Sequence, residues 1–237
     1  MFEPFLFYEI MQCRKDEMDL LKRGNLAFFL ILYSLVFLSC SSEKQAKEET
    51  VALDTAVLSQ SELLQTGIKK LEKWTGFWES KGADFGPGNF NPYQEHGFET
   101  VEWPEENPLS SENPLKRYQI PNPSSQGVVD IYHYKILVDP NLRVSLNPDA
   151  EVVYYKHNGM RERLLFIGPS GMFEDAAWVD DDKLLVSGHL QKEEGFVPIV
   201  WLVFPETKRY FVYESSFSTQ DYSPEAYLRE KLENLEF

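Results

Sequence analysis

The sequence predicts a mainly β fold of the α+β class: an antiparallel β-meander sheet or sandwich with an N-terminal helix, a C-terminal helix and a long Pro/Gly-rich loop. From residue 127 to 217, short segments rich in β-branched and aromatic residues alternate with turn residues, as in consecutive hairpins. Residues 58–81 and 223–236 instead place apolar residues at helical spacing. Residues 82–126 show no periodicity. Together these segments predict a single globular domain over residues 58–237.

A single apolar stripe predicts the first helix over residues 58–81. Its members are four, three, three and four residues apart, which places them on one face of a helix. Because the other face mixes lysine and glutamate, we expect the stripe to pack on a protein core rather than on a membrane surface. The stripe consists of Leu64, Ile68, Leu71, Trp74 and Trp78.

The long loop is predicted over residues 82–126. It contains four Asn-Pro pairs, and each proline fixes its own φ and biases the preceding residue toward extended conformations. A loop of this length within a compact domain is typical of a functional or mobile segment.

Part of this loop, NPYQEHGFETVEW at residues 91–103, is the candidate ligand-binding segment. It interleaves aromatic rings with amide and carboxylate groups, and such a surface offers a sugar or peptide both flat apolar faces and directional hydrogen bonds. The alternative is that these rings form the private core of an irregular loop. The candidate binding residues are Tyr93, His96, Phe98 and Trp103.

Turn residues divide the strand region into hairpins. Asn158-Gly159 joins EVVYYKH to MRERLLFI and predicts a type I′ turn, in which both turn residues take φ > 0. Residues 180–182 separate AAWV from KLLVSG, and residues 205–208 separate VPIVWLVF from RYFVYES. Consecutive hairpins of this kind predict an antiparallel meander.

Two segments predict strands of particular kinds. VVDIYHYKILV, residues 128–138, is expected to form one strand that ends at the turn Asp139-Pro140-Asn141. IVWLVF, residues 199–204, is apolar without alternation, which predicts a central strand covered on both faces.

The last helix is predicted to begin at Ser223-Pro224-Glu225. Serine is a favoured N-cap, proline is tolerated in the first turn, and glutamate is stabilised near the positive end of a helix. Leu228, Leu232 and Leu235 give this helix an apolar edge, so we expect it to dock on the sheet.

No assembled catalytic or metal-binding pattern is present in the sequence. The four histidines lack the H-x-x-x-H or H-x-H spacing of a zinc site. Residues 180–182, three aspartates, lack the alternating acids, glycine and final glutamate of an EF-hand loop. The glycines of Gly168-Pro169-Ser170-Gly171 do not have the spacing of a nucleophile elbow. The sequence therefore predicts no catalytic residue, metal or cofactor.

Net charge narrows the range of partners. The chain carries a formal charge of −15 at pH 7. So acidic a protein repels phosphate backbones, which argues against nucleic-acid binding, and it gains no general attraction to anionic lipid.

The N-terminal region resembles the signal segment of bacterial lipoproteins. Lys22 and Arg23 precede an uncharged run from Leu26 to Leu38, which is too short to span a membrane but has the length of a signal-peptide core. Phe37-Leu38-Ser39-Cys40 then resembles a lipobox of the looser Bacteroidota type. The alternative is an ordinary signal peptide or an uncleaved anchor. The resemblance implies that residues 1–39 are removed and that Cys40 is joined to a diacylglycerol and acylated, for example with palmitate.

This resemblance also sets expectations for the surrounding residues. Starting at Met18 would give a compact signal peptide, so we expect translation to begin there. Residues 40–57 are polar and charged, which predicts a flexible tether between the membrane and the domain.

The functional expectation is a lipid-anchored outer-membrane protein, facing either the periplasm or the cell surface, with a non-enzymatic domain that binds a protein or glycan. Its membrane contact is the N-terminal diacylglyceryl cysteine at Cys40. Two alternatives remain: a glycan-directed hydrolase and a structural component of an outer-membrane complex. A retaining hydrolase would need two carboxyl groups about 5 Å apart in a cleft.

Overall fold

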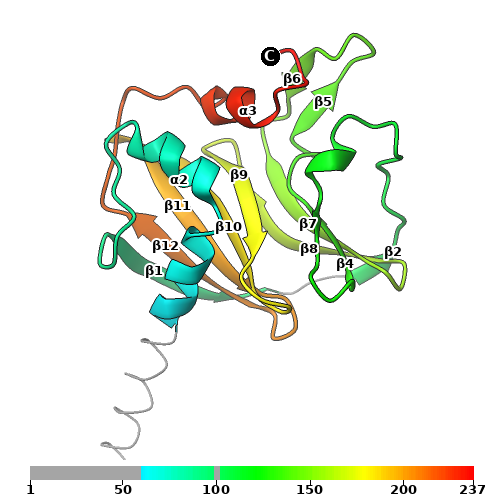
Figure 1. Cartoon of the computed structure of the whole chain (residues 1–237), viewed down its shortest axis with the longest axis horizontal. Helices are drawn as coiled ribbons and strands as arrows, with labels where there is room; N and C mark the ends of the chain where they lie inside the picture. Colours follow the sequence, from blue (N-terminus) through cyan, green and yellow to red (C-terminus); the bar gives the residue numbers. More distant parts are fainter. Residues whose placement is uncertain (1–59, 99–101) are drawn as a thin grey trace, which may run out of the picture. The chain divides into compact units, whose positions relative to one another are not determined.

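The computed structural model describes residues 60–98 and 102–237 of the 237-residue chain (Figure 1). The predicted signal peptide and tether, the lipobox and Met18 lie outside the described residues. Antiparallel sheets account for most of the regular secondary structure in the described part, and helices pack against them, which confirms the predicted mainly β, α+β fold.

One five-stranded sheet carries most of the core, and we call it sheet A. Every neighbouring pair of its strands is antiparallel. Its central strand β11 is buried on both faces from Gly195 to Val203, as predicted for IVWLVF. In spatial order its strands are β1 (Phe90–Gly97), β12 (Arg209–Ser215), β11 (Gly195–Phe204), β10 (Leu184–Lys192) and β9 (Gly171–Trp178).

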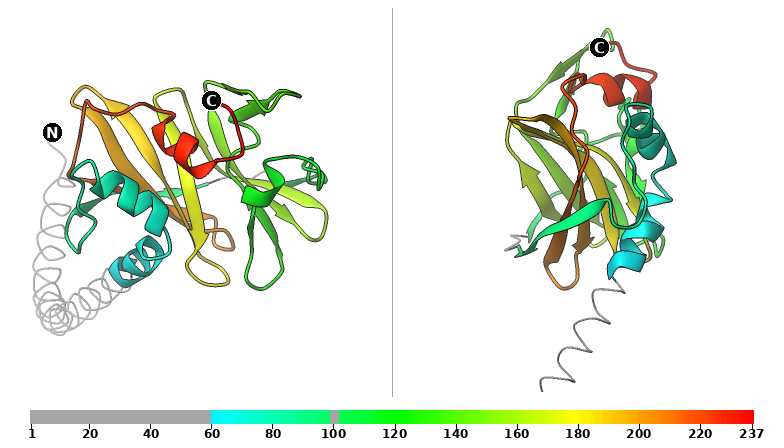
Figure 2. Two further views of the ribbon diagram at one scale, coloured as in Figure 1. Left: turned by 45° about the horizontal axis from the view of Figure 1, so that its top comes forward. Right: turned by 90° about the vertical axis from the view of Figure 1, so that its left-hand side faces the viewer.

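A second five-stranded sheet, sheet B, lies beside sheet A, where β9 packs next to β7 (Figures 1 and 2). The Trp178 ring of sheet A meets the Tyr154 ring of sheet B edge to face, with centroids 5.6 Å apart. In spatial order the strands of sheet B are β2 (Glu102–Pro104), β8 (Met160–Ile167), β7 (Ala150–Lys156), β4 (Gly127–Asp130) and β3 (Ile120–Pro121). A separate small hairpin pairs β5 (Ile136–Val138) with β6 (Val144–Leu146).

The first helical segment differs from the continuous helix predicted over 58–81. Residues 60–68 form one helix, and α2 (Glu72–Glu79) forms a second. The N–H groups of Lys70 and Leu71 donate to carbonyls three residues back, which ends the first helix with a tighter turn. All five residues of the predicted stripe are nevertheless buried. Figure 2 shows these helices on one side of sheet A.

Strands also form in the segment predicted as a loop over 82–126. Residues 91–103 supply most of β1 and all but one residue of β2, and the 3₁₀ helix η1 (Lys116–Tyr118) and β3 follow. Sequence reasoning missed β1 because proline usually excludes a strand. Pro92 is tolerated here because β1 is an edge strand with an irregular register between Pro92 and Gln94.

The single strand predicted over residues 128–138 is divided in two, β4 and β5. The Asp130 carboxylate accepts hydrogen bonds from the backbone N–H groups of Tyr132 (3.0 Å) and His133 (2.7 Å). This side-chain bond competes with strand pairing and turns the chain after Asp130. His133 therefore lies in a turn, not in a strand.

Two local expectations differ in detail. At the hairpin of β7 and β8, Gly159 has φ 83° whereas Asn158 does not have positive φ, so the turn is not type I′. The last helix, α3 (Ala226–Lys231), is shorter than 223–236, and Glu225 is its N-cap. It ends early because the chain beyond it runs beside β6, where Glu236 forms a parallel bridge with Arg143.

A β-bulge in β9 decides where two acidic side chains lie. Asp175 pairs with Ser187 and Phe173 pairs with Gly188, so Glu174 is an extra residue without a partner on β10. The bulge allows Glu174 and its neighbour Asp175 both to reach residues of the helical layer. Gly188 lies opposite the bulge, where an added Cβ would be 1.9 Å from the Met172 carbonyl oxygen.

Replacing Gly188 should therefore destabilise the protein far more than replacing a glycine that has open space around it. We expect Gly188→Ala to lower the free energy of unfolding by about 3 kcal/mol or more, because β9 must move away. Gly76→Ala, within α2 where nothing lies within 4 Å, should instead raise it by about 1 kcal/mol. Denaturant unfolding of the two variants checks this, and equal stabilities would contradict it.

Candidate functional site

The most strongly connected polar group in the described residues is the Glu174 carboxylate, which has no solvent exposure. It accepts hydrogen bonds from the indole N–H groups of Trp74 (2.8 Å) and Trp78 (3.1 Å). The His189 Nδ1 atom lies 2.8 Å from it, and the Tyr222 hydroxyl donates a short hydrogen bond. Four side chains from α2, β10 and the segment before α3 thus converge on one carboxylate.

Its neighbour Asp175 makes a parallel set of bonds toward α3. The Tyr227 hydroxyl donates to Asp175, and the Lys231 ammonium lies 2.6 Å from the same carboxylate oxygen. The Tyr132 hydroxyl in turn donates to the backbone carbonyl of Glu174 at 2.6 Å. Through these bonds the bulge holds both α2 and α3 against sheet A.

Electrostatics keep Glu174 ionised. Burial alone would raise the pKa of this carboxyl, but the charge of His189 and the hydrogen bonds from His189, Tyr222 and Trp74 outweigh it, so its pKa is below the usual value. Because its donors are all protein groups and it has no solvent contact, we interpret the Glu174 cluster as a structural clasp rather than a substrate site.

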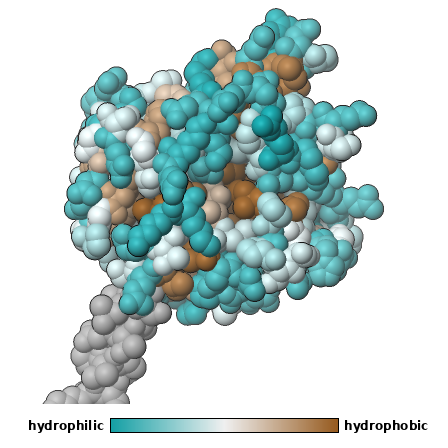
Figure 3. Space-filling view, viewed as in Figure 1, coloured by the Kyte–Doolittle hydropathy of each residue, from teal (hydrophilic) through white to brown (hydrophobic). Residues whose placement is uncertain are grey.

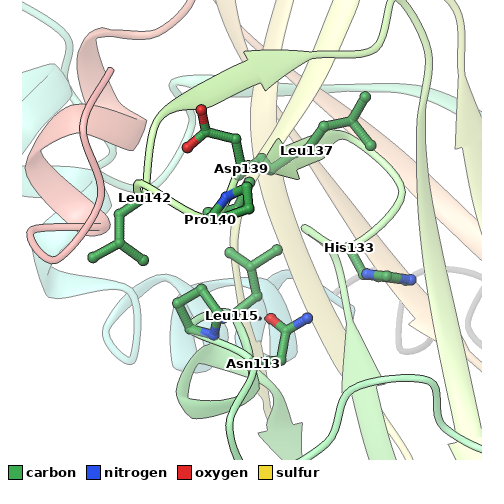
Figure 4. Close-up of a pocket in the computed structure, with 10 residues that line it drawn as sticks. Asn113, Leu115, His133, Leu137, Asp139, Pro140 and Leu142 are labelled. Carbon is green, nitrogen blue, oxygen red and sulfur yellow. Dashed lines mark hydrogen bonds between the residues drawn. The ribbon is translucent and has the colours of Figure 1, made fainter.

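A surface cavity of about 470 Å³ lies between the β5–β6 hairpin and the turn before η1 (Figure 4). Its lining is mostly aliphatic, with a few polar groups, which is the usual make-up of a ligand site. We call it the hairpin pocket. Its lining residues are Asn113, Pro114, Leu115, His133, Ile136, Leu137, Val138, Asp139, Pro140 and Leu142.

The polar groups of the hairpin pocket differ in their freedom to bind a ligand. Asp139 is committed, because its carboxylate accepts from the backbone N–H groups of Asn141 and Arg143 and pairs with the Arg143 guanidinium at 2.9 Å. The Asn113 side-chain oxygen accepts from the Leu115 N–H at 2.9 Å. Within the described residues, the Asn113 amide N–H₂ and the His133 ring make no hydrogen bond, so both remain available.

Large exposed apolar side chains gather at this pocket. Leu137 is 51% exposed and Leu142 is 43% exposed, and both side chains line the pocket. Tyr134, three residues before Leu137 in the sequence, is 41% exposed. Phe166 (51%), on β8, is exposed outside it. In Figure 3, hydrophobic atoms appear at the top of the molecule, over the β5–β6 region. Exposed apolar side chains beside a cavity are a feature of interaction sites.

The structure divides the ligand-binding residues predicted from the sequence between the two sheets. His96, on β1, stacks on the Tyr210 ring with centroids 4.9 Å apart, and Phe98 lies 6.0 Å from the same ring. Tyr93 also belongs to β1, but its side chain lies outside the described part. Trp103 stands on β2 in sheet B. Ligand binding by these four residues stays a prediction.

Trp103 is part of a different cluster, centred on Arg161. The Arg161 guanidinium lies 4.5 Å from the Trp103 ring centroid, and the indole N–H donates to Glu105 at 2.6 Å. Arg161 also contacts both Glu105 and Glu151. A single guanidinium thus pairs with both carboxylates.

Comparison of the chain with protein-family models, curated proteins and solved structures finds no match. Over residues 60–98 and 102–237, no helix is long and apolar enough to cross a membrane. The same residues contain no group of three or more His, Cys, Asp or Glu side chains placed to hold a metal ion.

Sequence reasoning did not find the hairpin pocket or the Glu174 cluster. The pocket joins Leu115, from the predicted loop, to Leu137 and Leu142 on either side of the predicted turn, and nothing in the sequence places them together. Glu174 did carry a signal, because GMFEDAAW sets two acids within an otherwise apolar strand. His189, the histidine of the cluster, lies 15 residues after Glu174 in the chain, a separation that no local pattern connects.

Loss of the Glu174 charge should weaken the clasp strongly. We expect Glu174→Gln to lower the free energy of unfolding at pH 7 by about 3 kcal/mol, because the amide presents an N–H₂ to groups that are themselves donors. Glu79→Gln, on an exposed position of α2, should change it little. Denaturant titration of both variants measures the difference.

The same clasp should depend on pH with a defined sign. Because the pKa of Glu174 is lowered in the folded protein, its contribution is fully present above the ordinary value of 4.5 and is lost as pH falls through the folded-state pKa. The stability gap between the native chain and Glu174→Gln should therefore narrow below about pH 4.5. Unfolding curves from pH 7 to pH 3 test this, and a gap that widens toward acid would contradict it.

Proposed function

We propose that this protein is a lipid-anchored protein of the bacterial outer membrane whose domain is a non-enzymatic interaction module. The anchor rests on the lipobox-like Phe37-Leu38-Ser39-Cys40 and the signal-like run before it. Diacylglyceryl-modified Cys40 would hold the chain in the membrane, and residues 40–57 would connect it to the domain.

The observation that carries the binding role is the hairpin pocket. It combines an aliphatic lining with two leucines that are about half exposed, Leu137 and Leu142. Leaving these side chains in water is unfavourable, and a partner that covered them would gain about 25 cal/mol for each Å² of apolar surface removed from water. We assign the pocket to an apolar segment of another envelope protein.

The polar end of the pocket supports a peptide occupant. The Asn113 amide and the His133 ring make no side-chain donor bond within the described residues and line the same cavity (Figure 4). An N–H₂ donor and an imidazole can bind the carbonyl and N–H groups of a peptide backbone, whereas a purely apolar ligand would leave both groups without partners. The carboxylates around Trp103 are paired with cations: Glu105 and Glu151 with Arg161, and Glu102 with Lys156, which gives no support to the hydrolase alternative.

Lipidation is tested by metabolic labelling with an alkyne analogue of palmitate in an expressing Gram-negative cell. We expect label on the native chain and none on Cys40→Ala, because the thiol that receives the lipid is absent. Cys13→Ala serves as the matched control and should label like the native chain after removal of the signal segment. Label that persists on Cys40→Ala would contradict the anchor.

The interaction surface is tested by photo-crosslinking in living cells. A photoreactive phenylalanine analogue replaces Leu137 or Leu142, and the same analogue at Phe166 is the control, since that side chain is equally exposed outside the pocket. We expect a crosslinked protein of one defined mass from the two pocket positions and none from position 166. Identical adducts at all three positions, or none at the pocket, would contradict the assignment.

A further inference from the structure

We propose that a second cavity, on the helical side of sheet A, binds a phosphate group. It measures about 490 Å³ and lies where the turn between the first two helices meets β9 and α3. We call it the lysine cavity, and it shares no lining residue with the hairpin pocket. Its lining residues are Lys69, Lys70, Leu71, Glu72, Lys73, Asp175, Ala176 and Lys231.

The charge of the lysine cavity is opposite to that of the protein. The whole chain carries −15, yet this lining has four lysines and only two carboxylates. One carboxylate, Asp175, is already bound by Lys231 at 2.6 Å and by the Tyr227 hydroxyl. Asp175 therefore neutralises Lys231, and the rest of the lining sets the three lysines Lys69, Lys70 and Lys73 against the single carboxylate of Glu72.

Lys70 is held in place without being neutralised. Its ammonium donates to the backbone carbonyls of Trp178 (2.9 Å) and Val179 (2.8 Å) at the end of β9. Carbonyl oxygens orient an ammonium but carry no formal charge, and an ammonium has three N–H donors. Lys70 thus keeps its positive charge and a third donor for a ligand.

The two neighbouring lysines are also free to respond to an anion. Lys69 is exposed, and its side chain makes no hydrogen bond or ion pair within the described part of the chain. Lys73 donates to the Glu230 backbone carbonyl at 2.7 Å, which does not neutralise its charge, and it pairs with Glu233 at 3.1 Å. The Glu233 side chain is 80% exposed, so this ion pair contributes little and is easily exchanged. An anion in the cavity would meet three cations whose existing bonds do not compete strongly with it.

The position of these lysines is electrostatically unfavourable, and a bound anion would relieve the repulsion. Lys69, Lys70 and Lys73 lie at the start of α2, the positive end of the helix dipole, where each cation is disfavoured. Leu71, the N-cap, provides no side-chain acceptor. The turn that interrupts the predicted continuous helix is what brings these lysines to the helix start and lets Lys70 reach β9.

A single phosphate group fits this lining better than an extended polyanion does. Its oxygens accept several N–H donors at once, and lysine binds it as a point charge. The acidic remainder of the protein repels extended polyanions, but salt screens that repulsion beyond about 8–10 Å, so a single phosphate group can still bind inside the cavity. Two sources share this chemistry: the headgroup of an anionic phospholipid and a free phosphate compound.

Binding to the full-length chain in neutral detergent tests the proposal. The probes are inorganic phosphate and soluble dihexanoyl phosphatidylglycerol, each titrated by calorimetry at constant ionic strength set with sodium chloride. We expect at least one probe to bind the native chain, and each of Lys69→Ala and Lys70→Ala to weaken that binding about tenfold, because each removes a charged hydrogen-bond donor. Lys81→Ala, whose ammonium lies over the Phe77 ring instead, should bind like the native chain.

Each outcome decides a different point. Binding of phosphatidylglycerol alone assigns the cavity to a lipid headgroup, and binding of inorganic phosphate, with or without the lipid, assigns it to a phosphate group as such. Lys69→Ala removes no side-chain hydrogen bond or ion pair within the described residues, so its effect is separate from any folding defect that Lys70→Ala introduces. Absence of binding by both probes, or equal weakening in Lys81→Ala, overturns the proposal whatever the labelling and crosslinking experiments show.

Discussion

Burial of the Glu174 carboxylate is the constraint on which the arrangement of the helices depends. An ionised carboxylate without solvent costs several kcal/mol unless donors surround it. Here the donors come from α2, from His189 on β10 and from Tyr222 before α3, segments that are distant in the sequence. Moving any one of these segments would remove at least one of the four partners of this buried charge, so one carboxylate constrains how the helical layer sits on sheet A.

The β-bulge is what makes this possible. A regular strand would direct Glu174 and Asp175 to opposite faces of the sheet, and only one of them could reach the helical layer. With the extra residue, Glu174 binds α2 while Asp175 binds α3. The lysine cavity borders this bulge through Asp175 and Lys231, so the same local irregularity supports both the clasp and the site that we assign to a phosphate group.

The two candidate sites occupy different surroundings, which suits two separate roles. The lysine cavity lies on the helices that the clasp holds, and Lys70 is bound to the end of β9. The hairpin pocket is built on β5 and β6, a two-stranded unit joined to the chain terminus through Glu236. An anchored domain with both features would engage a phosphate group on one side and a protein partner at another.

The sequence by itself determined the fold class, the hairpins between β7 and β12 and the buried face of the first helices, because these follow from local periodicity and turn chemistry. It did not determine β1, where Pro92 conceals an edge strand, or the turn after Asp130, where a side-chain bond displaces strand pairing. Both candidate sites were decided by tertiary structure alone. Their residues, such as Leu115 with Leu142 or Lys70 with Lys231, meet only when distant segments pack, and local sequence carries no record of such contacts.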